Sequence, residues 1–470
     1  MRVLFAVYII LTVMSRPLMA QESDMIDSSL NTVALEHLQL SKINIVGNKK
    51  TRRSIILREM SVQEGDSIVK AGLADVTELN RKRVFNLSLF TDVVILTDSS
   101  VPGTVTWDIV VKEQWYLIPE FTFKLADRNF NVWWVEQDRD IRRANIGVTL
   151  KNRNFRGNLE EVSATAQVGY TQKFGLQYYR PYIDKNQKHG FGFKFFLSRN
   201  EEWFYKTDSN KWEFAKTQGR YITNSFETSV SYILRPAYAS RHLLEASFKS
   251  QTIQDTITLL NSDYFLNGKR QMELVELLYR YDLNMVDNWN YPMHGLKVVV
   301  HSIFRIGIKG FNWQNVYMAE IGRFNNLGKK FYSSHIFRGR IAFPEKQPYV
   351  YVSAMGVGNE YIRGYEYYVI DGSHYGILRN NLKYELLNIK IKKLPIRYIS
   401  TLPFRLYPKV YTDVGYGRNK FPGNSTLNNR LLYSAGAGID IVSAYDIKLR
   451  VEYTWNHLGE KGLFLHFTSE

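Results

Sequence analysis

A charged turn in the last third of the chain has the residue types best suited to specific chemistry. Ile362-Arg363-Gly364-Tyr365 lies within GVGNEYIRGYEYYVIDG, between two segments that read as β-strands. Glycine permits a tight bend, and a guanidinium forms paired hydrogen bonds with a carboxylate. Ordinary surface loops also contain Arg-Gly, as Phe337-Arg338-Gly339 illustrates. Whether this turn has a specific role or is an ordinary surface loop therefore depends on the elements around it.

No set of residues elsewhere in the chain is suited to catalysis. Cysteine is absent, which excludes disulfides, thiolate catalysis and Cys-ligated metals. The nine histidines are scattered and show no metal-ligand spacing. Gly436-Ala437-Gly438 lies in a predicted strand with no helix after it, so it does not read as a dinucleotide loop. We predict that the protein is not an enzyme and uses no metal or cofactor.

The N-terminus reads as an export signal. Arg2 supplies a positive start, Val3–Met14 is an apolar run, and Ala20 offers a cleavage site, so residues 1–20 are predicted to be a signal peptide. The run is too short to span a bilayer as a helix. Residues 21–38 are polar and read as a short lead, and no later apolar stretch reaches the roughly 18 residues of a membrane helix.

The composition favours a membrane β-barrel. Aromatic residues make up 14% of the chain although the mean hydropathy is only −0.28. A barrel reconciles these values, because alternate residues face lipid and aromatics collect at the membrane interfaces. The net charge of +16 comes from basic residues spread along the chain, as expected for a polar lumen and loops. Nucleic acid is therefore not an expected partner.

Residues 39–119 read as a small α+β domain with the order β-α-α-β-β. Strands are predicted at 42–46, 93–97 and 104–112, with helices after Thr51 and over about 68–87. The apolar spacing changes from strand to helix period and back. The predicted core consists of Ile43, Ile45, Ile56, Leu79 and Phe90.

Residues 120–470 show a period of two. Near the C-terminus, apolar side chains at 447, 449, 451, 453 and 455 alternate with Lys448, Arg450, Glu452 and Thr454. Charged residues on one face and apolar residues on the other suit a wet lumen against lipid, whereas a soluble sandwich would bury one face. The length predicts an antiparallel transmembrane barrel of about 16 strands.

Both parts of the chain resemble the BamA/TamA superfamily of outer-membrane assembly barrels. The N-terminal unit is similar to a POTRA domain at Gly47-Asn48, Gly65-Asp66, Leu89-Phe90 and Val111-Lys112-Glu113. The turn at Arg363 is similar to the family's lid-loop motif. Tyr411-Thr412-Asp413-Val414-Gly415 is similar to its Phe-x-Asp-x-Gly motif, with Tyr in place of Phe. There is room for one POTRA domain, fewer than in BamA-type or TamA-type proteins.

The resemblance implies that the lid arginine enters the barrel and pairs with acidic strand residues. Asp413 is the first candidate, because it shares the predicted inward face with Lys409 and Tyr411. Glu385 is the second candidate, because it shares that face with Lys383. A bidentate Arg–carboxylate pair would fix a loop that otherwise costs conformational entropy to order.

The predicted function depends on a lateral seam between the first barrel strand, near 120–125, and the last, 463–468. The seam residues are Phe121, Phe123, Leu463, Leu465 and Phe467. Edge strands there would serve as templates for a nascent strand. We expect a protein that inserts, assembles or translocates other proteins. A secretion pore of the two-partner type and a passive or structural channel are the alternatives.

The same resemblance predicts location and partners. The barrel would lie in the outer membrane of a Gram-negative bacterium, with the POTRA domain in the periplasm. Expected partners are unfolded outer-membrane or exported proteins and the lipid bilayer, with periplasmic chaperones or accessory lipoproteins as further candidates.

Overall fold

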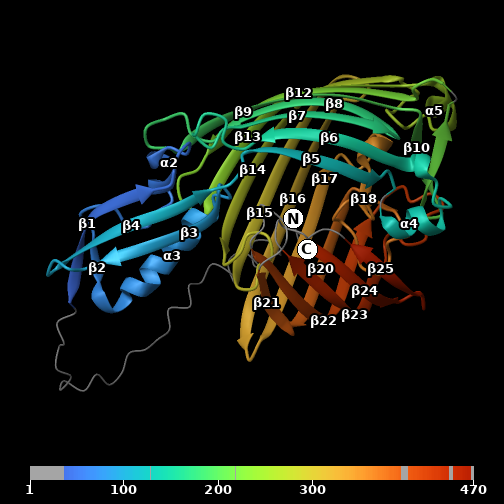
Figure 1. Ribbon diagram of the computed structural model, residues 1–470. Coiled ribbons are helices and arrows are strands. Elements are labelled where there is room, and N and C mark those ends of the chain that lie inside the picture. The colour runs from blue at the N-terminus through green and yellow to red at the C-terminus, as the bar shows by residue number, and fades with distance from the viewer. Residues whose placement is uncertain (1–35, 128, 218, 393–400, 444–447, 467–470) are drawn as a thin grey trace, which may run out of the picture.

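The computed structural model describes residues 36–127, 129–217, 219–392, 401–443 and 448–466. The predicted signal peptide, the polar lead up to residue 35 and the seam residue Phe467 lie outside the described residues. Figure 1 shows a small N-terminal domain beside one end of a large barrel. We call this end of the barrel the domain end and the opposite one the far end.

The N-terminal domain is a four-stranded sheet whose helices α2 and α3 pack with it in one hydrophobic core. The strand order is β2-β1-β4-β3, with β1 parallel to β4 and the other pairs antiparallel. The elements are β1 (His37–Val46), α2 (Arg53–Leu57), β2 (Ser67–Val69), η1 (Lys70–Gly72), α3 (Leu73–Phe85), β3 (Phe90–Asp98) and β4 (Thr104–Glu113).

Most of the predicted core of this domain is buried. Ile43, Ile56 and Phe90 are buried, and Ile45 packs against the cluster as a partly buried residue. The prediction for Leu79 is wrong, because its side chain is 45% exposed. The next residue of α3, Asn80, takes the inward position and is fully buried. Adjacent helical residues point about 100° apart, so both cannot face the sheet.

The buried side chain of Asn80 finds its hydrogen-bond partners within the N-terminal domain. The Asn80 side chain donates to the Val76 carbonyl (2.8 Å) and accepts from the Ser61 backbone N–H (2.6 Å). A buried amide needs such partners, because an unpaired one costs about 1–3 kcal/mol. Because the prediction counted only apolar residues as core residues, it placed Leu79 and not Asn80 on the inward face of α3.

Three predicted boundaries differ from the structure. The predicted second helix starts too early, because Ile68 lies in β2 and pairs with Leu38 of β1; α3 begins at Leu73. The first strand begins at His37, ahead of the predicted residue 42. The first barrel strand begins at Leu117, so the predicted domain boundary after Pro119 falls inside it.

Among the residues that the structure describes, a closed antiparallel sheet of seventeen segments forms the barrel. β20 and β21 are separated by two residues and both pair with β22, so they share one place in the wall, leaving 17 − 1 = 16 strand positions. This agrees with the predicted count. The segments are β5 (Leu117–Leu125), β6 (Ala144–Asn152), β7 (Glu161–Gly169), β8 (Thr171–Arg180), β9 (His189–Asn200), β12 (Thr223–Leu234), β13 (Ser240–Ile253), β14 (Gln271–Val286), β15 (Gly295–Lys309), β16 (Trp313–Gly328), β17 (Phe331–Phe343), β20 (His374–Tyr384), β21 (Leu387–Lys392), β22 (Thr401–Arg418), β23 (Leu431–Ser443), β24 (Lys448–Asn456) and β25 (Lys461–His466).

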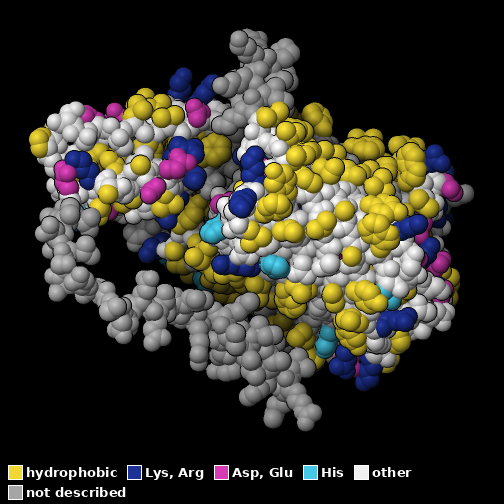
Figure 2. Space-filling view, turned by 90° about the horizontal axis from the view of Figure 1, so that it is seen from below, with side chains coloured by type: hydrophobic (Ala, Val, Ile, Leu, Met, Phe, Trp, Pro, Cys, Tyr) yellow, Lys and Arg dark blue, Asp and Glu magenta, His cyan; other side chains and the backbone are white. Residues whose placement is uncertain are grey.

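The two faces of the wall follow the predicted alternation. In β22, Val410 is 54% exposed on the outside, whereas Tyr411 and Asp413 are buried inside. Figure 2 shows hydrophobic side chains spread over the outer surface of the barrel. Within the described ranges, no helix is both long and apolar enough to cross a membrane.

Longer connections gather at the far end (Figure 1). They contain α4 (Phe130–Val135), η2 (Ile141–Arg143), the hairpin β10 (Glu202–Asp208) and β11 (Lys211–Lys216), α5 (Asp255–Leu260), η3 (Tyr349–Tyr351), and the pair β18 (Ser353–Met355) and β19 (Ile370–Asp371). At the domain end, the turn between β6 and β7 contacts the N-terminal domain, where the Arg52 N–H donates to the Gly157 carbonyl (3.0 Å).

Candidate functional site

The loop between β17 and β20, residues 344–373, folds inward and carries the predicted lid motif into the barrel. We call it the lid. Ile362, Arg363 and Tyr365 are all buried. Gly364 has φ +86°, and a Cβ there would lie 2.8 Å from Thr454 Cγ2 on β24. Glycine is therefore needed for both the bend and the close approach to the wall.

Arg363 lies directly on Asp413. Its Nε donates to Asp413 Oδ2 (2.8 Å), its Nη2 to Oδ1 (2.5 Å) and its backbone N–H to Oδ2 (3.0 Å). Neither side chain is exposed to solvent. This is the bidentate geometry that makes Arg–carboxylate pairs strong and directional. The structure thus brings together the lid arginine and its first predicted partner.

Three further side chains complete the surroundings of the guanidinium. Nη1 donates to Asn381 Oδ1 (2.7 Å) and to Glu452 Oε1 (3.2 Å), and Cζ lies 3.8 Å from the centroid of the Tyr411 ring. Sequence reasoning did not single out Asn381 or Glu452 as partners. The signal for Glu452 was present, because it lies on the charged face of the alternating last strands.

The prediction of Glu385 as second partner is wrong. Its carboxylate accepts a hydrogen bond from the Tyr407 hydroxyl (3.2 Å), and its N–H donates to the Lys330 carbonyl in the turn between β16 and β17. Glu385 follows the end of β20, four residues beyond Asn381, or about 13 Å along an extended strand. Glu385 follows the inward alternation of β20, but it lies too far toward the domain end to reach Arg363.

A chain of buried charges continues from the lid toward the domain end. Lys409 Nζ lies 2.8 Å from Glu452 Oε1 and 2.6 Å from Asp440 Oδ1. Lys383 Nζ lies 3.6 Å from Asp440 Oδ2. Each of these side chains is at most 5% exposed. Because a buried charge without a partner is costly, such a chain holds its members in one arrangement.

The seam lies where β25 follows β24 and meets β5 in the strand order. Phe121 and Phe123 of β5 and Leu463 of β25 point outward and are 83%, 62% and 56% exposed, while Leu465 is half-buried. The described part of β25 has six residues and pairs with β24 from Lys461 to His466. The structure thus places all the described seam residues on the two strands expected.

Two asparagines after β5 reach across to the last strand and the lid. Asn131 Nδ2 donates to the Leu463 carbonyl (2.7 Å), and Asn129 Nδ2 donates to the Glu366 carbonyl of the lid (2.7 Å). On the inner side of β25, Tyr361 OH lies 3.2 Å from His466 Nδ1. The connection between β5 and β6 therefore joins both the lid and the seam.

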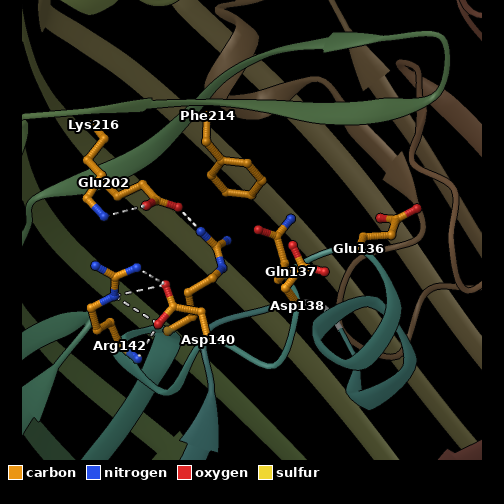
Figure 3. Close-up of a pocket in the computed structure, with 9 residues that line it drawn as sticks. Glu136, Gln137, Asp138, Asp140, Arg142, Glu202, Phe214 and Lys216 are labelled. Atoms are coloured by element: carbon orange, nitrogen blue, oxygen red, sulfur yellow. Dashed lines mark hydrogen bonds and ion pairs between the residues drawn. The ribbon is translucent and has the colours of Figure 1, made fainter.

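A cavity of about 570 Å³ lies at the far end, between α4, η2 and the β10–β11 hairpin (Figure 3). Arg143 is one of the residues that line it, with Nη2 2.7 Å from Asp127 Oδ1 and Cζ 4.5 Å from the Phe214 ring centroid. Hydrogen bonds from the Arg142 side chain and backbone lower the pKa of Asp140 to about 2. The lining residues are Glu136, Gln137, Asp138, Asp140, Arg142, Arg143, Glu202, Phe214 and Lys216.

Polar contacts hold the N-terminal domain against the barrel turns. Glu59 Oε1 lies 2.6 Å from Arg235 Nη1, with side chains 2% and 13% exposed. Burial alone would lower the pKa of Arg235, but Glu59 holds it above the ordinary value. Asn154 Nδ2 donates to Thr51 Oγ1 (3.0 Å), and Asn86 Nδ2 donates to Tyr238 OH (3.0 Å).

Comparison with known proteins gives a family for the N-terminal domain. Residues 39–114 match the POTRA family, described as a surface antigen variable number repeat. A stretch of 90 residues, 19% of this chain, is 31% identical to the outer membrane protein assembly factor BamA of Neorickettsia risticii (strain Illinois). That stretch spans only 12% of the relative's length.

Two solved structures share the fold over most of the chain. BamA from Haemophilus ducreyi lacking POTRA domains 1–3 aligns with a TM-score of 0.54 at 12% identity, over 92% of this chain and 83% of that one. CdiB from Escherichia coli aligns with a TM-score of 0.51 at 12% identity, over 92% and 76%.

The matched domain and the shared fold define the class: a β-barrel of the fold seen in these two structures, preceded by a POTRA domain. The sequence similarity to BamA covers 90 residues, and the likeness beyond that stretch is one of fold.

Proposed function

We propose that this protein inserts, assembles or translocates other proteins at the outer membrane of a Gram-negative bacterium, through the seam between β5 and β25. The POTRA domain and the domain end of the barrel then lie in the periplasm. The observation that carries the proposal is the hydrogen bond from Asn131 to the Leu463 carbonyl. A backbone carbonyl held by a side chain can exchange that donor for the N–H of an incoming strand. The proposed role is therefore templated pairing and involves no enzymatic step or cofactor.

The buried lid favours the seam over the lumen as the route. Passage along the lumen would displace Arg363 from Asp413, Asn381 and Glu452, leaving several charges and an amide without partners. Breaking a buried charge pair costs about 3–5 kcal/mol. Opening the seam instead separates β25, which has six residues, from β5, and a client strand can take the place of either partner.

The POTRA sheet offers a second place for a client strand. In the strand order β2-β1-β4-β3, the edges are β2, with three residues, and β3, with nine. An extended client segment can add to such an edge by backbone pairing, which requires little sequence specificity. We propose that β3 is the docking edge for unfolded outer-membrane or exported proteins before they reach the seam.

A seam disulfide tests the proposal, and the absence of native cysteine makes the test clean. Cysteines are introduced pairwise at Phe121 or Phe123 and at Leu463 or Leu465, and the register is scanned for oxidation. The protein is reconstituted in lipid vesicles with a urea-denatured outer-membrane barrel as client. Folding of the client is followed by its heat-modifiable gel migration. The oxidised seam should abolish insertion, and reduction should restore it.

The matched control crosslinks Phe123 to Ile146, which are paired neighbours on β5 and β6. This disulfide constrains the same first strand but leaves the seam free, so insertion should continue. Insertion at full rate with a locked seam would contradict the proposal. In cells, depletion should reduce many barrels together. Loss of one exported polypeptide alone would instead point to a two-partner secretion pore.

A further inference from the structure

The turn between β14 and β15, residues 287–294, lies at the domain end of the barrel, which the proposed function places in the periplasm. It contacts strands that are not its neighbours in the wall. The Tyr291 hydroxyl donates to Asp440 Oδ2 on β23 (2.8 Å), and the Tyr291 ring centroid lies 5.2 Å from that of Tyr407 on β22. In the strand order, β16, β17 and the shared place of β20 and β21 separate β15 from β22. A turn that touches β22 and β23 must therefore extend across the periplasmic end of the lumen.

The turn is a built structure with its own internal bonds. Asp287 Oδ1 accepts from the backbone N–H groups of Met293 (3.0 Å) and His294 (3.1 Å). Asn288 Oδ1 accepts from the N–H of Asn290 (2.8 Å). The Asn288 bond is of the Asx type, and the Asp287 bonds close the loop between its two ends, so together they fix its backbone. A loop with this geometry presents Tyr291 in one position.

Apolar and charged contacts seat the turn on the opposite wall. Tyr291 and Met293 are 7% and 9% exposed and pack with Tyr407 and Val442. Lys383 Nζ lies 4.5 Å from the Tyr291 ring centroid. Burial of this kind is typical of a folded plug and not of a solvated periplasmic turn.

The turn and the lid share anchors. Asp440, which holds Tyr291, is 2.6 Å from Lys409 Nζ. The same ammonium is 2.8 Å from Glu452, and Glu452 is 3.2 Å from Arg363 of the lid. Loss of either loop would leave Lys409 and its acids with one fewer compensating contact. Buried charges respond to such a loss by rearranging or taking up water.

We infer that residues 287–294 form an inner plug that closes the lumen at its periplasmic end, and that Lys409 couples this plug to the lid. The barrel is thus closed twice, from outside by the lid and from inside by the turn. The inference does not depend on the handling of client proteins, because it concerns the lumen of the barrel alone.

Conductance of the purified full-length protein in planar lipid bilayers tests the double closure. Arg363→Ala releases the lid, and replacement of residues 288–293 by a Gly-Ser loop of equal length removes the inner plug. Each single variant should stay near the wild-type conductance, and the combination should rise several-fold above the sum of the two. A lid variant that alone conducts as well as the combination would overturn the inner plug.

A conservative variant tests the coupling without endangering the fold. Tyr291→Phe removes only the hydroxyl that binds Asp440. Hydrogen exchange of the lid amides, residues 356–370, should become several-fold faster, while the heat-modifiable migration of the barrel is kept. The control replaces Lys329-Lys330, in the turn between β16 and β17, by Asn-Gly and should leave lid exchange unchanged. Unchanged lid exchange in Tyr291→Phe would overturn the coupling.

Discussion

At the scale of single residues, Arg363 shows how burial changes the energetic weight of an ion pair. Its guanidinium has two acids, one amide and an aromatic face around it, and no solvent. Arg142 at the far end also pairs with an aspartate, Asp140, but its side chain is 77% exposed. Exposed pairs contribute about 0–1 kcal/mol, whereas breaking a buried pair costs about 3–5 kcal/mol.

We predict that Arg363→Ala destabilises the closed lid by about 3–5 kcal/mol, because Asp413 and Glu452 lose a buried cation. The temperature at which the barrel changes its gel migration should fall clearly, and protease should reach the lid. Arg142→Ala is the matched control and should change the temperature little. Exchange of the two charges, Arg363→Asp with Asp413→Arg, should recover more stability than either single variant shows.

Gly364 is the second residue whose replacement should loosen the lid. We predict that Gly364→Ala is destabilising, because φ +86° is strained for alanine and the new Cβ would press on Thr454. The left-handed conformation alone costs about 1–2 kcal/mol. Gly358, also in the lid, has φ +61° but open space around its Cβ position, so Gly358→Ala separates strain from clash.

Lid protease sensitivity compares the two glycine variants directly. Gly364→Ala should be cleaved faster than Gly358→Ala, and both faster than the wild type. Equal sensitivity of the two variants would show that contact with Thr454 does not limit the position of the lid.

At the scale of elements, the connection between β5 and β6, which contains α4, binds the last strand at the seam through Asn131. We predict that Asn131→Ala raises hydrogen exchange in β25, because the Leu463 carbonyl loses a bond of about 0.5–1.5 kcal/mol. Amide exchange followed by mass spectrometry over residues 457–466 measures this. Asn326→Ala is the control, since Asn326 caps an exposed turn at the end of β16 and should not affect β25. Unchanged exchange in Asn131→Ala would show that this hydrogen bond does not stabilise β25 at the seam.

The POTRA core provides a second prediction at this scale. Phe90→Ala should lower the free energy of unfolding of the domain by about 3–5 kcal/mol, because a buried aromatic side chain is truncated. Phe85→Ala removes the same group from a site that is 44% exposed and should cost much less. Urea-dependent proteolysis of the domain within the full chain measures both. Similar losses for the two variants would contradict the assigned core.

At the scale of the whole molecule, the POTRA domain is fastened to the barrel by a buried ion pair. We predict that Glu59→Gln increases the freedom of the domain, because Arg235 loses its carboxylate while 13% exposed. Small-angle scattering should report a larger radius of gyration. The control Glu36→Gln breaks an exposed pair with Lys70 and should leave the scattering curve unchanged. An unchanged curve for Glu59→Gln would mean that the remaining contacts suffice.

Much of the architecture was predictable from the sequence, because local patterns encode it. The period of two fixes which residues face the lumen, and it placed Lys409, Tyr411 and Asp413 inward as found. The pattern was less informative where a polar residue takes a core position. Asn80 displaced Leu79 from the sheet because its own hydrogen bonds make its burial tolerable.

The sequence by itself determined the strand faces, the approximate number of strands, the lid motif and Asp413 as its first partner. Only the tertiary structure decided which inward residues meet across the lumen. Glu385 and Glu452 both have inward parity, yet only Glu452 reaches Arg363. Whether a residue faces the lumen follows from its position within one strand. Which residues then meet across the lumen depends on the tilt and register of all the strands around the closed sheet. The same closure brings Tyr291 to Asp440, a contact between strands far apart in the wall.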